Sequence, residues 1–246
     1  MLDSWLDLVH GATCVGCGQP GRSLCADCDQ TLPGRGRSVR PTPCPPGLAA
    51  CFAAGEYDDL LRAMLLAHKE HGAFSLAAPL GRVLAGAAMS ALDPTGATVL
   101  APVPSRPHVV RARGHDPVLR MARVAARLLR RGDHKVQVAQ VLGQRGVVDD
   151  QAGLNASQRA ANLAGSMGVR PTARAALARC DAPLSLLVCD DVLTTGATAR
   201  EAQRALEESG LRVRAVVTVA ATRRRVPPRV VTSDGPYRFP VMRTNV

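Results

Sequence analysis

Residues 184–198 read Leu-Ser-Leu-Leu-Val-Cys-Asp-Asp-Val-Leu-Thr-Thr-Gly-Ala-Thr. The apolar run at 184–189 predicts a buried strand that delivers two acids, Asp190 and Asp191, one short loop ahead of a helix predicted over 197–209. A second apolar run predicts another strand over 212–220. Strands that alternate with helices indicate an α/β fold with a parallel sheet, and ligands bind such sheets beside the carboxyl ends of the strands. The stretch therefore predicts both a fold class and a place for a ligand.

The rest of the chain continues this alternation. Apolar spacing predicts helices over 60–67, 76–92 and 117–131, and strands over 98–103 and 136–142. Residues 2–9 are expected to form a short helix, and residues 143–153 a mobile loop. Residues 33–47 are rich in Pro, Gly and Arg and are expected to form a linker. We therefore divide the chain into a small module with its linker at 1–47 and an α/β domain at 48–246.

Composition excludes several classes of protein. Of the 246 residues, 46% are hydrophobic, which is enough for a proper core. No apolar run approaches the roughly 18 residues of a membrane-spanning helix, and the first ten residues lack the basic start of a secretory signal. We expect a soluble, cytoplasmic protein without membrane insertion. An aromatic content of 2% argues against modules that stack bases on exposed rings.

The formal net charge of +11 is concentrated in two segments. Residues 104–131 carry eight Arg against Asp116 alone, and residues 222–246 carry six Arg against Asp234 alone. Such clusters attract phosphates, either on nucleic acid or on a small ligand. Within the helix predicted over 117–131, four arginines share one face: Arg120, Arg123, Arg127 and Arg130. This stripe is either a solvated face or a surface that binds single-stranded DNA.

Four of the eight cysteines form two Cys-x2-Cys pairs, Cys14 with Cys17 and Cys25 with Cys28. Paired knuckles of this kind can gather four thiolates around a tetrahedral Zn²⁺. All four ligands would come from the protein, which indicates a structural ion and excludes an open catalytic position. The alternative is two disulfides in an exported domain, and no export signal supports it.

The loop after the acids has the chemistry of a phosphate cradle. Thr194, Thr195 and Thr198 offer hydroxyls, Gly196 lets the backbone approach closely, and the helix that begins at Ala197 offers unpaired amides. The carboxylates of Asp190 and Asp191 would repel a phosphate, but they can accept hydrogen bonds from two neighbouring sugar hydroxyls. A phosphate beside a sugar diol describes a ribose 5-phosphate group. A plain helix cap would need only one such polar residue.

Residues 187–198 resemble the phosphoribosyl pyrophosphate (PRPP) signature of the type I phosphoribosyltransferases. The resemblance extends over nearly the whole chain to the ComF (GntX-like) family of amidophosphoribosyltransferase-like proteins. That family combines a four-Cys zinc knuckle, a Tyr-centred segment similar to the one from Tyr57 to Lys69, a strand that ends in Pro-Val-Pro, and an Arg-Gly pair. The matching residues here include Pro102-Val103-Pro104, Arg113-Gly114, Gln151, Leu154, Arg159 and Asn162. Two stretches depart from the family pattern, His115-Asp116-Pro117 and the loop from Arg145 to Asp150.

The resemblance implies a fold, a reaction and a set of site residues. The fold would be a type I phosphoribosyltransferase-like (Rossmann-like) parallel sheet flanked by helices. PRPP would bind with Mg²⁺, and ribose 5-phosphate would be transferred to a nitrogen nucleophile. Asp190 and Asp191 would hold the ribose hydroxyls and act in catalysis, and the loop Thr194, Thr195, Gly196, Ala197 and Thr198 would hold the 5-phosphate. Candidates for pyrophosphate are Pro104, Ser105, Arg106, Arg113 and Arg145.

Two other functions stay open beside the transferase. The chain could be a non-catalytic competence (DNA-uptake) factor that binds single-stranded DNA or a helicase partner through its arginine-rich helix and tail. It could also be a regulator that senses PRPP without turning it over. No residue identifies the acceptor nucleophile, and association into a homo-oligomer is left open.

Overall fold

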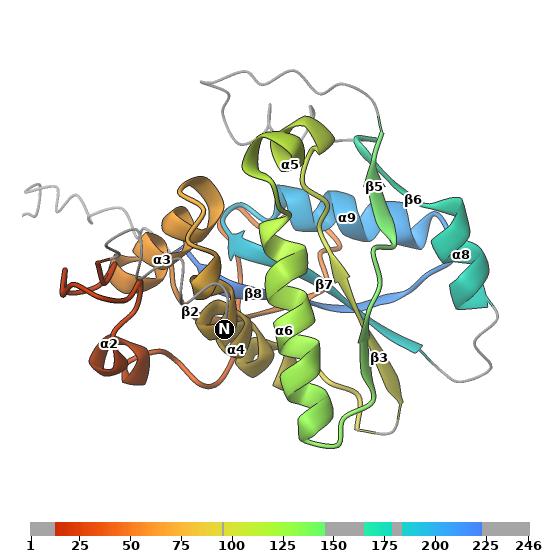
Figure 1. Ribbon diagram of the computed structural model, residues 1–246. Helices are drawn as coiled ribbons and strands as arrows, with labels where there is room; N and C mark the ends of the chain where they lie inside the picture. The colour runs from red at the N-terminus through yellow and green to blue at the C-terminus, as the bar shows by residue number, and fades with distance from the viewer. Residues whose placement is uncertain (1–12, 95, 146–164, 179–183, 223–246) are drawn as a thin grey trace, which may run out of the picture.

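A six-stranded sheet forms the centre of the computed structural model, which describes residues 13–94, 96–145, 165–178 and 184–222 (Figure 1). The strands lie in the order β1-β2-β8-β7-β3-β4. Their bounds are β1 Arg37–Val39, β2 Ala50–Glu56, β3 Ala97–Pro102, β4 Val136–Val138, β7 Leu184–Leu193 and β8 Val213–Ala221. The edge strand β1 is antiparallel to β2, whereas the other pairs are parallel. The expected α/β class with a mostly parallel sheet is confirmed.

Helices cover both faces of the sheet and bury one apolar cluster on each. The helices α3 (Asp59–Glu70), α4 (Ala77–Met89) and α6 (Pro117–Arg131) pack on one face, where Leu80, Met121 and Leu187 are fully buried. The helix α9 (Ala197–Glu207) packs on the other face against Val188 and Val216. Side chains alternate between the two faces of a strand, so the continuous apolar run of β7 supplies both clusters.

The remaining elements are short and lie around this core. The helix α2 (Ala26–Gln30) contains Cys28 and begins just after its N-cap residue Cys25, the 3-10 turn η1 (Phe74–Leu76) precedes α4, and α5 (Pro107–Arg113) follows β3. The strands β5 (Leu142–Gln144) and β6 (Met167–Val169) form a separate antiparallel pair, and α8 (Pro171–Ala178) follows β6. None of the described helices is long and apolar enough to cross a membrane.

Three expectations about local structure are wrong. Residues 33–47 were expected to be a linker, but residues 37–39 form the edge strand β1. The strand expected over 136–142 stops at Val138, because the chain turns just after it, where the Val141 N–H donates to the Ala139 carbonyl at 2.9 Å. Residues 142–144 form the separate strand β5, where residue 142 was expected to end the preceding strand and residues 143 and 144 to belong to a loop. The expected helix at 2–9, the family-like segment 151–162 and the basic tail after Thr222 lie outside the described residues.

Candidate functional site

A cavity of about 590 Å³ lies at the carboxyl ends of the parallel strands. Its lining comes from elements that are far apart in the sequence. Tyr57 follows β2, the turn 104–106 follows β3, Asp190 and Asp191 belong to β7, and Thr194 and Thr198 follow β7. The fold therefore brings most of the residues predicted for PRPP to one place. Thr195, Gly196 and Ala197 lie between the two lining threonines without lining the cavity themselves.

The two carboxylates have different environments. The Lys69 ammonium donates to Asp191 Oδ2 at 2.9 Å, and it reaches the cavity from α3. Burial, followed by the negative charge of Asp191, raises the pKa of Asp190 well above its usual range. Backbone amides partly satisfy both groups, since Asp191 N–H donates to Asp190 Oδ1 at 2.9 Å and Val192 N–H donates to Asp191 Oδ1 at 2.8 Å. Asp191 is thus paired with a cation. Asp190 is the carboxylate whose ionised form hydroxyl donors or a bound cation would stabilise most.

The loop between β7 and α9 turns through Gly196, which has a φ of 73°. This left-handed conformation favours glycine. The Ala197 N–H lies 3.5 Å from Thr195 Oγ1, and the first turn of α9 leaves further backbone N–H groups without intrahelical acceptors. The helix start at Ala197 agrees with the sequence, and the amides and hydroxyls expected of a phosphate cradle are present.

The reason expected for Gly196 is corrected by the structure. From the sequence, Gly196 was expected to be a glycine so that the backbone could approach a ligand phosphate closely. A Cβ there would instead lie 2.9 Å from Pro41 Cγ and 3.0 Å from Leu48 Cδ2. The segment 41–48 crosses this loop and is tied to α9, because Arg200 Nε donates to the Pro46 carbonyl and Gln203 Nε2 donates to the Gly47 carbonyl. The proline-rich segment therefore braces the loop between β7 and α9.

The turn after β3 forms the facing wall of the cavity. Pro104, Ser105 and Arg106 all line it, and Arg106 is the N-cap residue of α5. The Ser105 N–H points at Asp116 Oδ2 over 3.5 Å. Gln144, on β5, also lines the cavity and donates from Nε2 to the Pro104 carbonyl at 2.9 Å. Sequence reasoning missed Gln144, since a lone glutamine in an expected loop carries no pattern.

The two outlying arginine candidates differ. Arg113 lines the cavity from the end of α5, where its guanidinium forms an ion pair with Glu70. Arg145 does not line it, and its side chain lies against Gly168 of β6, where a Cβ would overlap it. His115, a departure from the family pattern, is buried and approaches the His68 carbonyl at 3.1 Å through Nε2. Asp116 caps α6 by accepting from Leu119 N–H at 3.1 Å.

The four cysteines converge as their spacing predicts. The Sγ atoms of Cys14, Cys17, Cys25 and Cys28 lie within 4.8 Å of one another, which is compatible with a structural zinc ion. Gly16 is required here, because a Cβ would lie 2.8 Å from Cys28 Sγ. Burial opposes ionisation of the Cys14 thiol, but donors that include the Cys17 and Cys25 backbone amides lower its pKa to about 6. Neighbouring thiols, Cys25 first, raise the pKa of Cys28 to about 12. Four such crowded thiols ionise together only around a cation.

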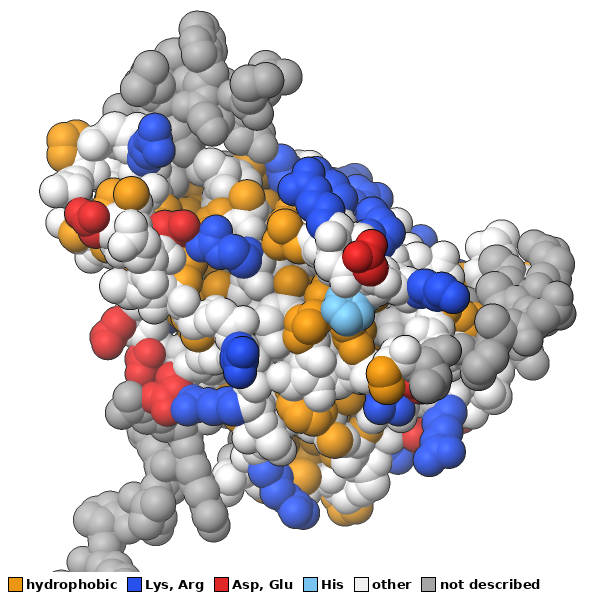
Figure 2. All heavy atoms as spheres, turned by 90° about the horizontal axis from the view of Figure 1, so that it is seen from below, with side chains coloured by type: hydrophobic (Ala, Val, Ile, Leu, Met, Phe, Trp, Pro, Cys, Tyr) orange, Lys and Arg blue, Asp and Glu red, His pale blue; other side chains and the backbone are white. Residues whose placement is uncertain are grey.

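The predicted arginine stripe on α6 is partly engaged. Arg120 lies over the Phe74 ring at 4.7 Å, and Arg130 Nη1 donates to the Val136 carbonyl at 3.0 Å. Arg123 and Arg127 line the shallow grooves on both sides of α6. Figure 2 looks at the molecule from below, where Lys and Arg side chains stand between hydrophobic ones and acidic side chains are fewer. Binding of single-stranded DNA to this stripe stays a prediction.

Comparison with known proteins does not assign a function to this site. No protein-family model matches the chain, and no curated protein matches it significantly.

Proposed function

We propose that the chain is a phosphoribosyltransferase of the ComF type that binds PRPP with Mg²⁺ in the cavity at the carboxyl ends of the strands. The observation that carries the proposal is the convergence of three kinds of group in one cavity. Asp190 and Asp191 provide carboxylates, Thr194 and Thr198 provide hydroxyls beside a helix N-terminus, and residues 104–106 provide a turn at a strand end. This combination suits a ligand with a sugar diol between two phosphate groups.

Each wall of the cavity has a defined task in this function. The amides at the start of α9 and the nearby threonine hydroxyls bind the 5-phosphate, which is a dianion. Asp190 and Asp191 accept hydrogen bonds from the ribose hydroxyls and fix the ring. Positive charge builds on the ribose as pyrophosphate leaves C1, and carboxylates beside the ring stabilise it. Lys69 holds Asp191 in position through the 2.9 Å ion pair, so it is a positioning residue.

The carboxylates also fit a magnesium ion, because Mg²⁺ prefers carboxylate oxygens and substrate phosphates as ligands. When bound, Mg²⁺ would neutralise the charge that develops on the leaving pyrophosphate. Zn²⁺ would occupy the separate cluster of Cys14, Cys17, Cys25 and Cys28 and serve a structural role. The acceptor is a nitrogen nucleophile of a base or an amine.

Calorimetry with PRPP and Mg²⁺ tests the binding step. We expect measurable binding by the unaltered protein and a loss of about a hundredfold or more when Asp190→Asn and Asp191→Asn are combined, since hydrogen bonds to a charged group contribute about 1.5–3 kcal/mol each. Asp133→Asn is the matched control. Asp133 follows α6 with a φ of 62°, and asparagine adopts this conformation readily. No binding by the unaltered protein, or equal binding by the double variant, contradicts the proposal.

Turnover is tested separately by mass spectrometry. The protein is incubated with PRPP, Mg²⁺ and a metabolite extract, and the products are searched for a new ribose 5-phosphate adduct. We expect both the adduct and released pyrophosphate to disappear in the double Asn variant. Binding without either product would replace the transferase by the PRPP-sensing regulator.

A further inference from the structure

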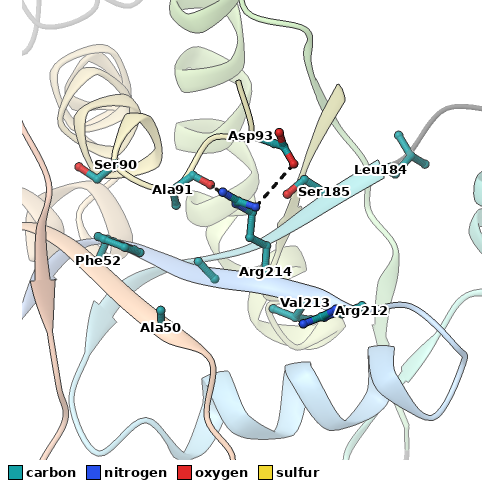
Figure 3. A pocket seen from close by; sticks show the side chains of 11 residues that line it. Ala50, Phe52, Ser90, Ala91, Asp93, Leu184, Ser185, Arg212, Val213 and Arg214 are labelled. Carbon is teal, nitrogen blue, oxygen red and sulfur yellow. Dashed lines mark hydrogen bonds and ion pairs between the residues drawn. The ribbon is translucent and has the colours of Figure 1, made fainter. Parts of the chain in front are cut away.

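A second cavity lies at the opposite end of the sheet, where the parallel strands begin (Figure 3). It measures about 550 Å³ and is lined by the starts of β2, β7 and β8 and by the residues that follow α4. None of its lining residues lines the cavity around Asp190. The proposed function therefore leaves this cavity without a role.

A β-bulge places an arginine in this cavity. Leu186 pairs with Val213 and Leu187 pairs with Ala215, so Arg214 is an extra residue in β8. Bulges re-aim side chains, and they occur frequently beside functional sites. Figure 3 shows the Arg214 side chain rising from β8 toward Ala91 and Asp93. Its Nε donates to the Ala91 carbonyl at 2.9 Å, and its Nη1 lies 3.5 Å from Asp93 Oδ2. Because a guanidinium carries five N–H donors, the anchored side chain retains donors for a ligand.

A second guanidinium stands at the rim. Arg212 lines the cavity just before β8 begins, and it is exposed. Within the part of the chain that the structure describes, no hydrogen bond or ion pair is found for its side chain. The lining contains two guanidinium groups, those of Arg212 and Arg214, but only the one carboxylate of Asp93, which pairs with Arg214, so the cavity has an excess of positive charge. Planar guanidinium groups match carboxylates and phosphates.

A buried hydroxyl at the same place lacks a partner. Ser185, on β7, is 8% exposed and lines the cavity, and its Oγ has no hydrogen-bond partner among the described residues. Leaving a buried hydroxyl unpaired is unfavourable, so such groups usually indicate a missing water or ligand. A ligand acceptor that reaches this hydroxyl would satisfy it.

The rest of the lining is largely apolar. Phe52 of β2 presents its ring to the cavity, together with small side chains such as Ala50 and Ala215. This surface can cover a ring or a short hydrocarbon body but offers it no side-chain hydrogen bonds. The cavity thus combines a cationic rim, a single buried hydroxyl and an apolar wall.

We propose that this cavity binds a small organic anion whose carboxylate or phosphate contacts Arg212, Arg214 and Ser185 and whose apolar or aromatic body packs on Phe52. The site is independent of PRPP binding. Strand β7 joins the two cavities, with Ser185 at its start and Asp191 near its end.

Titration of the full chain with four probes, followed by NMR and calorimetry, tests the proposal. The probes are phenyl phosphate, benzoate, inorganic phosphate and neutral benzyl alcohol. We expect phenyl phosphate or benzoate to shift the amide signals of Ser185, Ala91 and Arg214, inorganic phosphate to bind there at least tenfold more weakly, and benzyl alcohol not to bind. Whichever of phenyl phosphate and benzoate binds more tightly shows whether the natural ligand carries a phosphate or a carboxylate.

Variants separate this cavity from the phosphate cradle at α9. Arg212→Gln keeps every described contact of the fold and should weaken the aromatic anion about tenfold, whereas exposed Arg62→Gln on α3 should not. Ser185→Ala should weaken binding without lowering the melting temperature, because it removes an unpaired hydroxyl. Binding that survives both cavity variants, or signals that shift only around residues 194–198, would overturn the proposal. Failure of all four probes to shift Ser185 would overturn it too, with a trapped water then satisfying the hydroxyl.

Discussion

Gly196 shows how one residue supports the candidate site, because it lets the segment 41–48 pack against the loop between β7 and α9. Its φ of 73° is costly for any other residue, and the proline-rich segment leaves no room for a Cβ. We expect Gly196→Ala to destabilise the fold by about 2–4 kcal/mol, of which about 1–2 comes from the left-handed backbone and the rest from overpacking. Urea unfolding measures the total.

The matched control is Gly210→Ala. Gly210 has a φ of 79°, but no atom lies within 4 Å of a Cβ built there. This variant should show the backbone cost of about 1–2 kcal/mol alone. Equal losses at both positions would mean that the segment 41–48 does not press on the loop in solution.

His68 makes the stability depend on pH. Burial is the main cause that lowers the pKa of His68 from 6.5 to about 4, against a raising contribution from the Ala73 carbonyl. The unfolded chain therefore binds a proton that the folded chain excludes, and stability falls as the pH drops from about 6.5 toward 4. The contribution of this group reaches roughly 3 kcal/mol at the low end.

The measurement is an NMR titration of the His68 imidazole together with urea unfolding between pH 7 and 5. We expect the ring of His68 to stay neutral across this range, because burial lowers its pKa to about 4. An ordinary titration of His68 near pH 6.5 would show that its ring is not excluded from water.

At the scale of elements, sequence reasoning succeeded where local signals agree. The helix α6 was predicted at 117–131 from its apolar spacing, and the ends that the structure shows agree with this range: Asp116 caps the helix, Pro117 occupies its first turn and Gly132 follows its end. The strand β2 was missed, since its sequence Ala-Cys-Phe-Ala-Ala-Gly-Glu lacks the β-branched residues typical of strands. Only its partners define it, as β2 pairs with β8 in parallel.

In the candidate site, too, the residues that are contiguous in the sequence were predicted, and the contacts that only the fold creates were missed. The two acids and the threonine loop are contiguous in the sequence and were predicted together. Lys69 was noted only within a segment that resembles the family, and its ion pair with Asp191 spans 122 positions. Gln144 was missed for the same reason. Tertiary packing of α3 and β5 decides these contacts, and no periodicity in the chain encodes them.

A hydrogen bond from Met167 of β6 to Glu201 of α9 joins these two elements and gives a prediction at this scale. Glu201 is 5% exposed and accepts from Met167 N–H at 2.9 Å and from Arg204 Nε at 2.7 Å. We expect Glu201→Gln to destabilise the protein by about 1.5–3 kcal/mol, because it removes the charge from buried hydrogen bonds. Hydrogen exchange at the Met167 amide should accelerate.

Glu208→Gln is the matched control for Glu201→Gln. Glu208 also pairs with Arg204, but its side chain is 60% exposed, so its loss should cost at most about 1 kcal/mol. If both variants behaved alike, Glu201 would be no more than a surface ion pair, and β6 would be held by its apolar contacts.

At the scale of the whole molecule, the cysteine module is continuous with the main core. Val15, Leu24 and Leu32 pack against the apolar cluster under α3 and α4, and Arg82 of α4 binds Asp29 of α2 at 2.6 Å. A separate zinc finger on a flexible tether would show none of these contacts. The module therefore adds an apolar cover to one end of the core.

Loss of the metal should consequently loosen the module without unfolding the sheet. We expect the purified protein to hold one zinc ion and Cys25→Ser to release it, because three thiolates and a hydroxyl bind zinc less tightly than four thiolates. Hydrogen exchange should then rise over residues 13–32 and along α3 and α4 beneath them, while the amides of β7 stay protected by their pairing with β3 and β8.

Cys44→Ser, a change at a free thiol outside the cluster, should keep both the zinc and the protection. Protein that contains no zinc, or a Cys25→Ser variant whose exchange matches the unaltered chain, would show that apolar packing alone holds the module. Exchange that rose equally in β7 would show instead that the module and the sheet unfold as one unit.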